Sequence, residues 1–185
     1  MSVPKVSVAL VACTALYLAS AIYAFGRRKI GYSHISHTIS ELGERGAPDE
    51  LTVSWGVFLP VGVAMAITWL AVRDSAPAAA SLAGVVAVGY VGGAVFRCDI
   101  GSPVHGSWRQ TLHNLAGGVE YVGGIACLLS LGRQQPLFAV LAAVVAIATL
   151  LVSIPAASAR GLVQRLAEAS LFGSLLAALI FADAA

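Results

Sequence analysis

The sequence predicts an all-α membrane protein: a bundle of six transmembrane helices, with a short interfacial amphipathic helix in the first long connector. Three observations lead to this fold class. Of the 185 residues, 58% are hydrophobic and only 11% are charged, which is too apolar for an ordinary soluble domain. The apolar residues form runs of about 20, the length that crosses a ~30 Å hydrocarbon core as a helix. The alternating segments of about ten residues that a β-barrel needs are absent from the sequence.

Six apolar runs are the expected membrane-spanning helices, and together they form a single integral-membrane domain over residues 1–185. They cover about 6–25, 53–72, 77–96, 110–131, 136–155 and 162–182. The first run follows a lone Lys, lacks a cleavage site of small residues and is followed by the basic stretch GRRK. This pattern is typical of a retained first span and not of a removed signal peptide.

The first connector is long, and its segment Tyr32–Gly43 has the pattern of an amphipathic helix. His34, His37 and Glu41 are spaced i, i+3 and i+7, so a helix would place them on one face. The apolar residues of the segment fall on another face: Ile35, Ile39 and Leu42. A helix with these two faces lies at a membrane interface. The alternative is that the two histidines and Glu41 form a solvated polar face with no further role.

Six crossings place the first, third and fifth connectors on one side of the membrane. All four histidines lie in the first connector and in the stretch 97–113 around the third, so we expect Glu41 and His37 to lie near Asp99, His105 or His113. Eight of the 11 Lys and Arg residues belong to this side. They are Arg27, Arg28, Lys29, Arg45, Arg97, Arg109, Arg160 and Arg165. The positive-inside rule therefore makes this side cytoplasmic, in a plasma or cell inner membrane.

Glu120 is an ionisable residue inside the fourth apolar run. A start near Gln110 and a rise of about 1.5 Å per residue put it roughly 15 Å deep, near the middle of the hydrocarbon. Such a residue is expected to face the interior of the bundle and to mark a functional site. His113 and Gly117 share its helical face. The alternative is a structural Glu that hydrogen-bonds between helices. Another acid, Glu168, is three residues from Arg165 and is expected to pair with it.

These polar residues resemble a known family. The segment YSHISHTISELG, the later Phe96-x-x-Asp99, and His105 followed by His113-Asn114 resemble the prokaryotic membrane family called domain of unknown function 998. The layout is more distantly similar to the Frag, DRAM and Sfk membrane family, which is involved in lipid handling and autophagy. The first resemblance implies no assigned activity. The residues that match its polar pattern are Ser40, Glu41, Asp99, His105 and His113. Two positions depart from it: Arg97-Cys98 stands where a Pro is expected, and Glu120 where the family is usually apolar.

The favoured hypothesis is an integral-membrane enzyme that acts on an isoprenoid or another lipid by acid–base proton transfer. Burial disfavours the charged form of a carboxyl group, so Glu120 would hold a proton at neutral pH and donate it. Asp99 or Glu41 would act as base or stabilise positive charge, and His113 would relay protons. The candidate substrate-binding residues are His37, His105, Trp108, Tyr121, Tyr90 and Phe96. The aromatic rings of Trp108, Tyr121, Tyr90 and Phe96 can stabilise a carbocation, as in a membrane terpene-cyclase type of reaction.

Two other functions fit parts of the sequence. A non-enzymatic lipid-binding or scaffold protein needs no catalytic acid. A metal-dependent hydrolase would use the three histidines and the aspartate, although His105 and His113 are eight residues apart and no HExxH motif occurs. We expect no metal and no cofactor, and the expected partners are a lipophilic small molecule and the membrane. Nucleic acid is excluded because the net charge is only +2 and the basic residues are scattered.

Overall fold

The computed structural model describes residues 5–184, and every regular element in that part of the chain is a helix. The uninterrupted long helices are α1 (Lys5–Arg28), α4 (Pro77–Val95), α5 (Trp108–Gly132), α6 (Pro136–Val152) and α7 (Arg160–Ala184). A further long helix combines α2 (Glu50–Val53), the π-helical η2 (Ser54–Phe58) and α3 (Leu59–Val72). The first connector contains one 3₁₀ turn, η1 (Ser40–Gly43).

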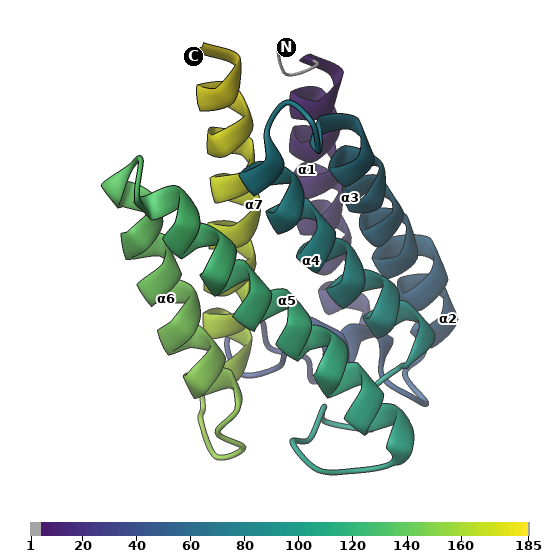
Figure 1. The fold of residues 1–185 in the computed structure, drawn as a ribbon. Coiled ribbons are helices and arrows are strands. Elements are labelled where there is room, and N and C mark those ends of the chain that lie inside the picture. The colour runs from purple at the N-terminus through teal and green to yellow at the C-terminus, as the bar shows by residue number, and fades with distance from the viewer. Residues whose placement is uncertain (1–4, 185) are drawn as a thin grey trace.

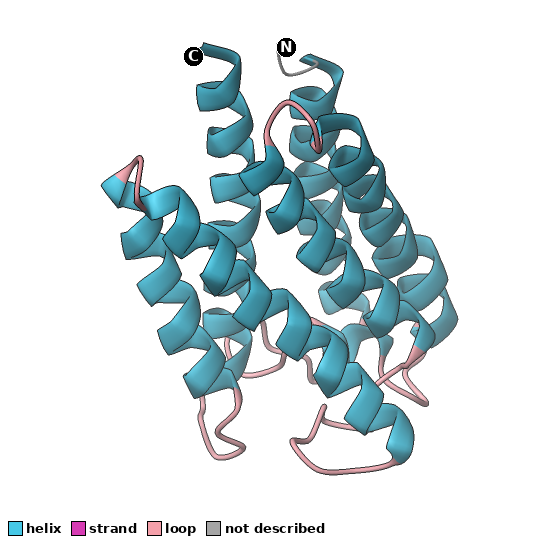
Figure 2. Cartoon of the chain, in the orientation of Figure 1, coloured by secondary structure: helices cyan, strands magenta, loops and turns pink. Residues whose placement is uncertain are grey.

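Five of these long helices have the length and apolarity to cross a membrane, and α6, with 17 residues, is a shorter apolar helix. Neighbouring helices in the sequence run in opposite directions, and both ends of the chain lie at one end of the bundle (Figure 1). The loops are confined to the two ends, with the first, third and fifth connectors together at the end opposite the termini (Figure 2). The predicted shared side of these connectors is therefore confirmed.

The ends of the helices follow from local chemistry. Pro77 and Pro136 begin α4 and α6, where the missing proline N–H would have had no helical partner. Ser107 caps α5 by accepting a hydrogen bond from the backbone N–H of Gln110 at 3.3 Å. Pro60 has no N–H, so it cannot donate a helical hydrogen bond to the carbonyl of Gly56. The hydroxyl of Tyr17 on α1 donates to this carbonyl instead. This contact ties α1 to the π-helical turn.

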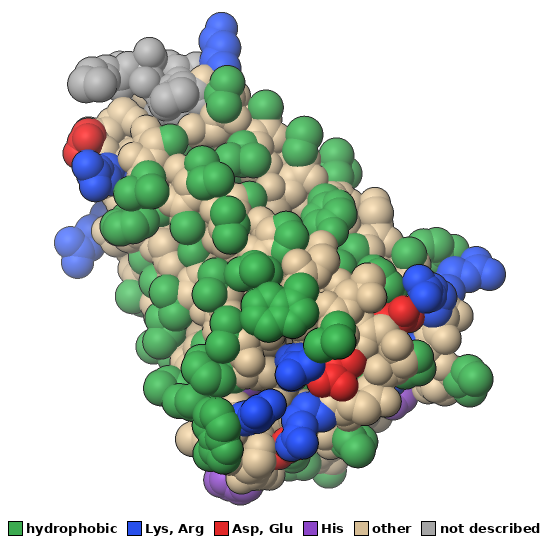
Figure 3. Space-filling model, turned by 90° about the vertical axis from the view of Figure 1, so that its right-hand side faces the viewer, with side chains coloured by type: hydrophobic (Ala, Val, Ile, Leu, Met, Phe, Trp, Pro, Cys, Tyr) green, Lys and Arg blue, Asp and Glu red, His purple; other side chains and the backbone are tan. Residues whose placement is uncertain are grey.

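The surface has the distribution of polarity that a bilayer requires. One face of the molecule is covered by hydrophobic side chains over most of its length, and its charged side chains gather towards the two ends (Figure 3). A band of this kind excludes most charges from the hydrocarbon and leaves them near the head groups. The chain is therefore a multi-helix protein of membrane type.

The prediction of an amphipathic helix over residues 32–43 is wrong. The segment forms turns followed by the short η1, and Ile39, Glu41 and Leu42 are buried. Several of its backbone groups are bonded to α7 instead of to one another. The N–H of Leu162 donates to the carbonyl of Ile35 at 2.9 Å, and the N–H of Ile39 donates to the side-chain oxygen of Gln164 at 2.6 Å. The segment is thus packed against the N-terminal end of α7.

Candidate functional site

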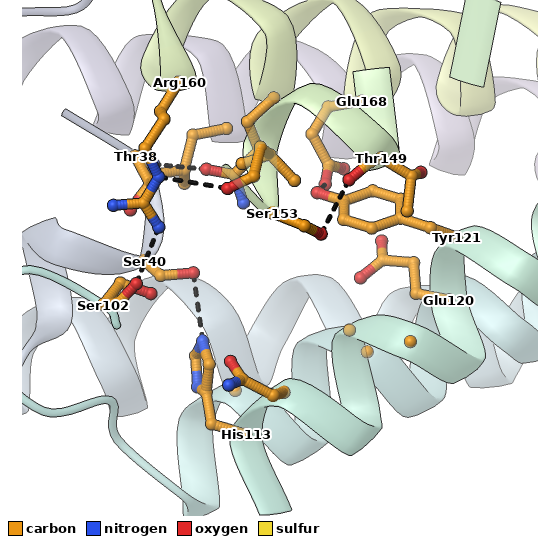
Figure 4. A pocket seen from close by; sticks show the side chains of 18 of the residues that line it. Thr38, Ser40, Ser102, His113, Glu120, Tyr121, Thr149, Ser153, Arg160 and Glu168 are labelled. Carbon is orange, nitrogen blue, oxygen red and sulfur yellow. Dashed lines mark hydrogen bonds between the residues drawn. The ribbon is translucent and has the colours of Figure 1, made fainter. Parts of the chain in front are cut away.

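A cavity of about 280 Å³ lies between α4, α5, α6 and α7, and residues of the first and third connectors also line it. We call its two ends the connector end and the inner end. The connector end is lined by residues that include Ser40, Ser102, Ser153 and Arg160. The inner end is lined by Gly89, Tyr90, Glu120, Tyr121 and Glu168. Side chains of both ends project toward one open space (Figure 4).

Glu120 occupies the position that the sequence predicts. Glu120 is 5% exposed and lines the cavity. Its Oε1 atom has no hydrogen-bond partner in the described part of the chain. Gly89 on α4 leaves room for its carboxyl group, because a Cβ atom there would overlap Oε2. His113 and Gly117 line the same cavity, which confirms the predicted shared face of α5. A buried oxygen without a partner in a low-dielectric region is costly, so it is a candidate contact for a bound molecule.

Glu168 on α7 is the second acid of the inner end, and it is 7% exposed. The hydroxyl of Tyr90 donates to its Oε2 at 2.9 Å, and the hydroxyl of Tyr121 donates to its Oε1 at 2.8 Å. The predicted pair between Arg165 and Glu168 is wrong. Arg165 instead donates to the carbonyls of His34 and His37 in the first connector, at 2.9 and 3.1 Å.

His113 is held in one tautomer by two contacts. Its Nδ1 is 2.8 Å from the carbonyl oxygen of Phe96, which can only accept, so Nδ1 carries the hydrogen. In the neutral ring Nε2 is then an acceptor, and the hydroxyl of Ser40 donates to it at 3.1 Å. The pair places a polarised hydroxyl in the connector end of the cavity. Its side chains come from η1 and α5, so it also joins the first connector to the bundle.

Asp99 anchors the start of α5 and does not line the cavity. Its Oδ2 accepts from the backbone N–H of Ser107 at 2.7 Å, and its Oδ1 accepts from the Ser107 hydroxyl at 2.9 Å. These two hydrogen bonds, with Arg45 at 3.7 Å, hold the pKa of Asp99 below its usual value. The carboxylate thus serves as a structural cap, and the structure gives it no contact with Glu120.

Glu41 is also turned toward its own connector. Its Oε1 accepts from the N–H and the hydroxyl of Thr38, at 2.8 and 3.0 Å. His37 accepts from the backbone N–H of Ser33 at 3.0 Å and stacks on the ring of Tyr32. Within residues 5–184, no hydrogen bond or ion pair joins Glu41 or His37 to a side chain of the third connector or to His113. The predicted cluster of these side chains is therefore not formed.

The remaining predicted binding residues divide between cavity and surface. Tyr90 and Tyr121 line the cavity. Trp108 is 64% exposed at the start of α5, where the guanidinium of Arg109 lies 5.2 Å from its ring centroid. Phe96 packs edge-on against Trp108, outside the cavity lining. His105 is exposed in the third connector. Trp108 has the position of an interfacial aromatic anchor.

The candidate metal ligands do not converge. Among the described residues 5–184, no group of three or more His, Cys, Asp and Glu side chains could hold a metal ion. Both ring nitrogens of His113 contact Phe96 and Ser40, and both oxygens of Asp99 contact Ser107. The ligand set that the hydrolase hypothesis requires is therefore not assembled in this structure.

A second hollow is an apolar groove of about 510 Å³ between α1 and α7. Its walls are mostly Ala, Leu, Ile and Phe side chains, with His34 and Arg165 at its connector end. Burial lowers the pKa of His34, and the charge of Arg165 lowers it further, which favours the neutral form of this imidazole. Ile39 and Glu168 line both the groove and the cavity. Glu168 is thus on the wall between an apolar groove and a polar cavity.

The polar or charged cavity residues that were not predicted as site residues include Ser40, Arg160 and Glu168. For Glu168 a signal existed, because an acid within the last apolar run meets the same criterion as Glu120. Ser40 and Arg160 lie in or next to connectors, and their place in the cavity depends on contacts between segments far apart in the sequence.

No curated protein and no solved structure matches this chain. A family model described as protein of unknown function (DUF998) matches residues 10–181, which is nearly all of the sequence and includes every residue of the cavity. The chain therefore belongs to this family.

Proposed function

We propose that this protein is an integral-membrane enzyme that moves protons on a lipophilic substrate, an isoprenoid or another lipid, in a reaction of the terpene-cyclase or isomerase type. One observation carries the proposal: two buried carboxyl groups, Glu120 and Glu168, face one cavity in different hydrogen-bonding environments. Such a pair supplies one acid and one base, because its two members are not equally suited to the charged form.

The hydrogen bonds support the assignment of the two roles. Glu168 accepts two tyrosine O–H donors, which favour a carboxylate. Glu120 has an oxygen with no donor near it, which favours the neutral acid. Two carboxylates in one buried site also repel each other, so a single shared negative charge is the less costly state. Glu120 is then the proton donor and Glu168 the proton acceptor.

The chemistry balances without another reactant. Glu120 donates its proton to one carbon of an alkene, and the neighbouring carbon becomes positively charged. The rings of Tyr90 and Tyr121 and the carboxylate of Glu168 stabilise that charge. Glu168 then removes a proton from an adjacent carbon, which leaves an isomerised or cyclised hydrocarbon of unchanged composition. Glu168 then releases its proton to solvent and Glu120 takes up a proton from solvent, which restores the starting state. Positioned acid–base groups of this kind contribute about 10²- to 10⁴-fold in rate.

The apolar groove supports a lipophilic substrate. It lies between α1 and α7, two helices whose length and apolarity suit a membrane span, and it shares Glu168 with the cavity. A hydrocarbon chain in the groove would be next to the proposed base without leaving an apolar environment.

The proposed setting is a plasma or cell inner membrane crossed six times by a single domain. In this arrangement α6 spans the bilayer although it has only 17 residues. A bilayer can become thinner around a short helix, and long polar side chains next to the helix can extend to the head groups. The connector end then faces the cytoplasm, in line with the excess of Lys and Arg on that side.

The experiment that tests the proposal compares two substitutions at position 120. Membranes that contain wild-type protein, Glu120→Gln or Glu120→Leu are incubated with total lipid extract, and the lipids are profiled by chromatography and mass spectrometry. Glu120→Gln keeps the shape and loses the transferable proton, so conversion should fall by about 10²-fold or more while thermal stability is kept. Asp74→Asn, on a side chain that is 81% exposed, is the matched control. A fully active Gln variant beside a destabilised Leu variant would reduce Glu120 to a structural role.

A further inference from the structure

Arg160 is the one Lys or Arg side chain among the described residues that line the cavity. It joins three segments through backbone carbonyls. Its Nε donates to Val152 at 3.0 Å, Nη1 donates to Gly101 at 3.2 Å, and Nη2 donates to Ser102 at 2.7 Å. Each terminal nitrogen carries two hydrogens, so these bonds leave one N–H on Nη1 and one on Nη2.

The charge of Arg160 has no acidic partner in the described part of the chain. None of the ion pairs within 4.0 Å involves this guanidinium, although five other basic side chains have such a partner. Carbonyl oxygens satisfy N–H groups but do not neutralise a full charge. The two free N–H groups of this charged side chain can donate to the oxygens of a phosphate or a carboxylate.

The backbone of the third connector is strained where it holds this side chain. Gly101 and Ser102 both have positive φ, of 77° and 44°, and Ser102 is the one non-glycine residue with positive φ among the described residues. Their two consecutive carbonyls accept the hydrogen bonds from Arg160. Left-handed backbone is disfavoured at a non-glycine residue and persists only where surrounding contacts maintain it. The connector is therefore built around a fixed position of the guanidinium.

The cavity also contains an independent sign of a bound molecule, which is the unpartnered Oε1 of Glu120 at its inner end. Between the two ends, the α5 positions His113 and Glu120 are seven residues apart, or about 10 Å along the axis. The hydroxyl of Ser40 on Nε2 of His113 is a further polar group of the connector end. The arrangement has a cation at the connector end and a proposed proton donor at the inner end.

We infer that the connector end binds the anionic head group of the substrate, a phosphate or a carboxylate, through Arg160, while the hydrocarbon extends toward Glu120. This inference rests on the proposed function and names its substrate class: a single-chain or isoprenoid lipid with an anionic head. Arg160 would fix the position of the head group, so that the same carbons of the chain reach Glu120 in each turnover.

Binding to the purified protein in phosphatidylcholine nanodiscs tests the inference. The probes are decyl phosphate, decanoate, the neutral decanol and inorganic phosphate, with affinity followed by thermal shift and calorimetry. At least one anionic amphiphile should bind about tenfold or more tighter than decanol, the value of one charge-assisted contact. The tighter binder of decyl phosphate and decanoate shows whether the site prefers a phosphate or a carboxylate head group. Inorganic phosphate should bind weakly because it lacks the hydrocarbon chain.

The matched variants are Arg160→Gln and Arg165→Gln. Both arginines donate to connector carbonyls, but only Arg160 lines the cavity. Arg160→Gln should lose about tenfold or more in affinity for the anionic probe and Arg165→Gln should not. Equal affinity of the wild-type protein for decanol, or unchanged affinity in Arg160→Gln, would overturn the inference.

Two further variants are needed. Gly117→Leu tests the head-group site if Arg160→Gln fails to fold, and Glu120→Gln separates the head-group site from the proposed proton donor. If Arg160→Gln does not fold, Gly117→Leu places a side chain in open space of the cavity and should abolish binding of the anionic probe. Unchanged binding in Gly117→Leu would place the probe elsewhere and overturn the inference. Glu120→Gln should keep the affinity and lose turnover. Full turnover in Glu120→Gln would refute the proposed proton donor and leave the head-group site intact.

Discussion

Gly89 on α4 lies against Glu120 on α5 so closely that a Cβ atom at position 89 would overlap the carboxyl oxygen Oε2. Gly89→Ala should therefore displace the carboxyl group of Glu120 from its place in the cavity. Overpacking of a tight contact costs about 1–3 kcal/mol, and a misplaced proton donor loses most of its rate. Lipid conversion and thermal unfolding of the variant measure the two effects.

Gly117→Ala is the control for this prediction. Gly117 lines the same cavity from the same helix as Glu120, but a Cβ atom there meets no atom within 4 Å. The variant should keep activity and gain slightly in stability, because Ala favours a helix more than Gly. Equal loss of activity in the two variants would mean that cavity volume, and not the position of Glu120, limits the reaction.

Asp99 predicts a pH dependence of stability. Its pKa in the folded protein is lowered from 3.8, chiefly by the backbone N–H of Ser107 and then by the Ser107 hydroxyl. The contribution of the Asp99 carboxylate to the free energy of unfolding is therefore complete above about pH 4. It is lost as the pH falls through the lowered pKa of Asp99 in the folded protein. Asp99→Asn should unfold at a lower temperature than wild type at neutral pH, and the difference should shrink in acid. A difference that stays constant down to about pH 3 would contradict this role.

Cys98 is predicted to be an inert thiol. Burial, followed by the charge of Glu44, raises its pKa to about 12, and its Sγ donates to the carbonyl of Ser40 at 3.3 Å. In a background with Cys13→Ser and Cys127→Ser, Cys98 should resist maleimide at about pH 8 until the protein unfolds. Ile100→Cys in the same connector, at a position 77% exposed, should react at once. Rapid labelling of Cys98 in the folded protein would mean that the third connector is not packed against η1.

The direction of crossing can be tested with the same chemistry. Asp74 lies in the second connector and Ile100 in the third, and α4 separates them. A membrane-impermeant maleimide should label Asp74→Cys in intact cells and Ile100→Cys only in inverted vesicles or permeabilised cells. The opposite result would reverse the proposed orientation, and labelling of both positions from one side would rule out α4 as a crossing.

The helices were predictable because a 20-residue apolar run has few alternatives to a helix in a bilayer. The expected run 77–96 is α4, Pro77–Val95. The segment 32–43 was not predictable in the same way. Its polar and apolar residues have the spacing of a helix, but several of its backbone groups are hydrogen-bonded to α7. The residues of α7 that make these bonds are Leu162, Gln164 and Arg165. Contacts over more than 120 positions override a local pattern of this kind.

The site was predictable only in part. His113 and Glu120 could be placed together because seven residues on one helix define one face. Glu168 was missed because Arg165, three residues away, resembled its partner. The structure instead uses Arg165 for the first connector and gives Glu168 two tyrosine hydroxyls from α4 and α5. Asp99 and Glu41 matched the polar pattern of the family, and both hold the connectors in place.

The central claim, that Glu120 donates a proton to carbon, is tested most directly by incorporation of deuterium from solvent. Wild-type protein and Glu120→Gln are equilibrated in D₂O and incubated with lipid extract, and the products are analysed by mass spectrometry after washing in H₂O. The carboxyl proton exchanges with solvent between turnovers, so wild-type product should carry deuterium on carbon, which washing does not remove. The Glu120→Gln sample should lack this product. A product of the wild-type protein without carbon-bound deuterium, or equal incorporation in both samples, would contradict the assignment of Glu120 as the proton donor.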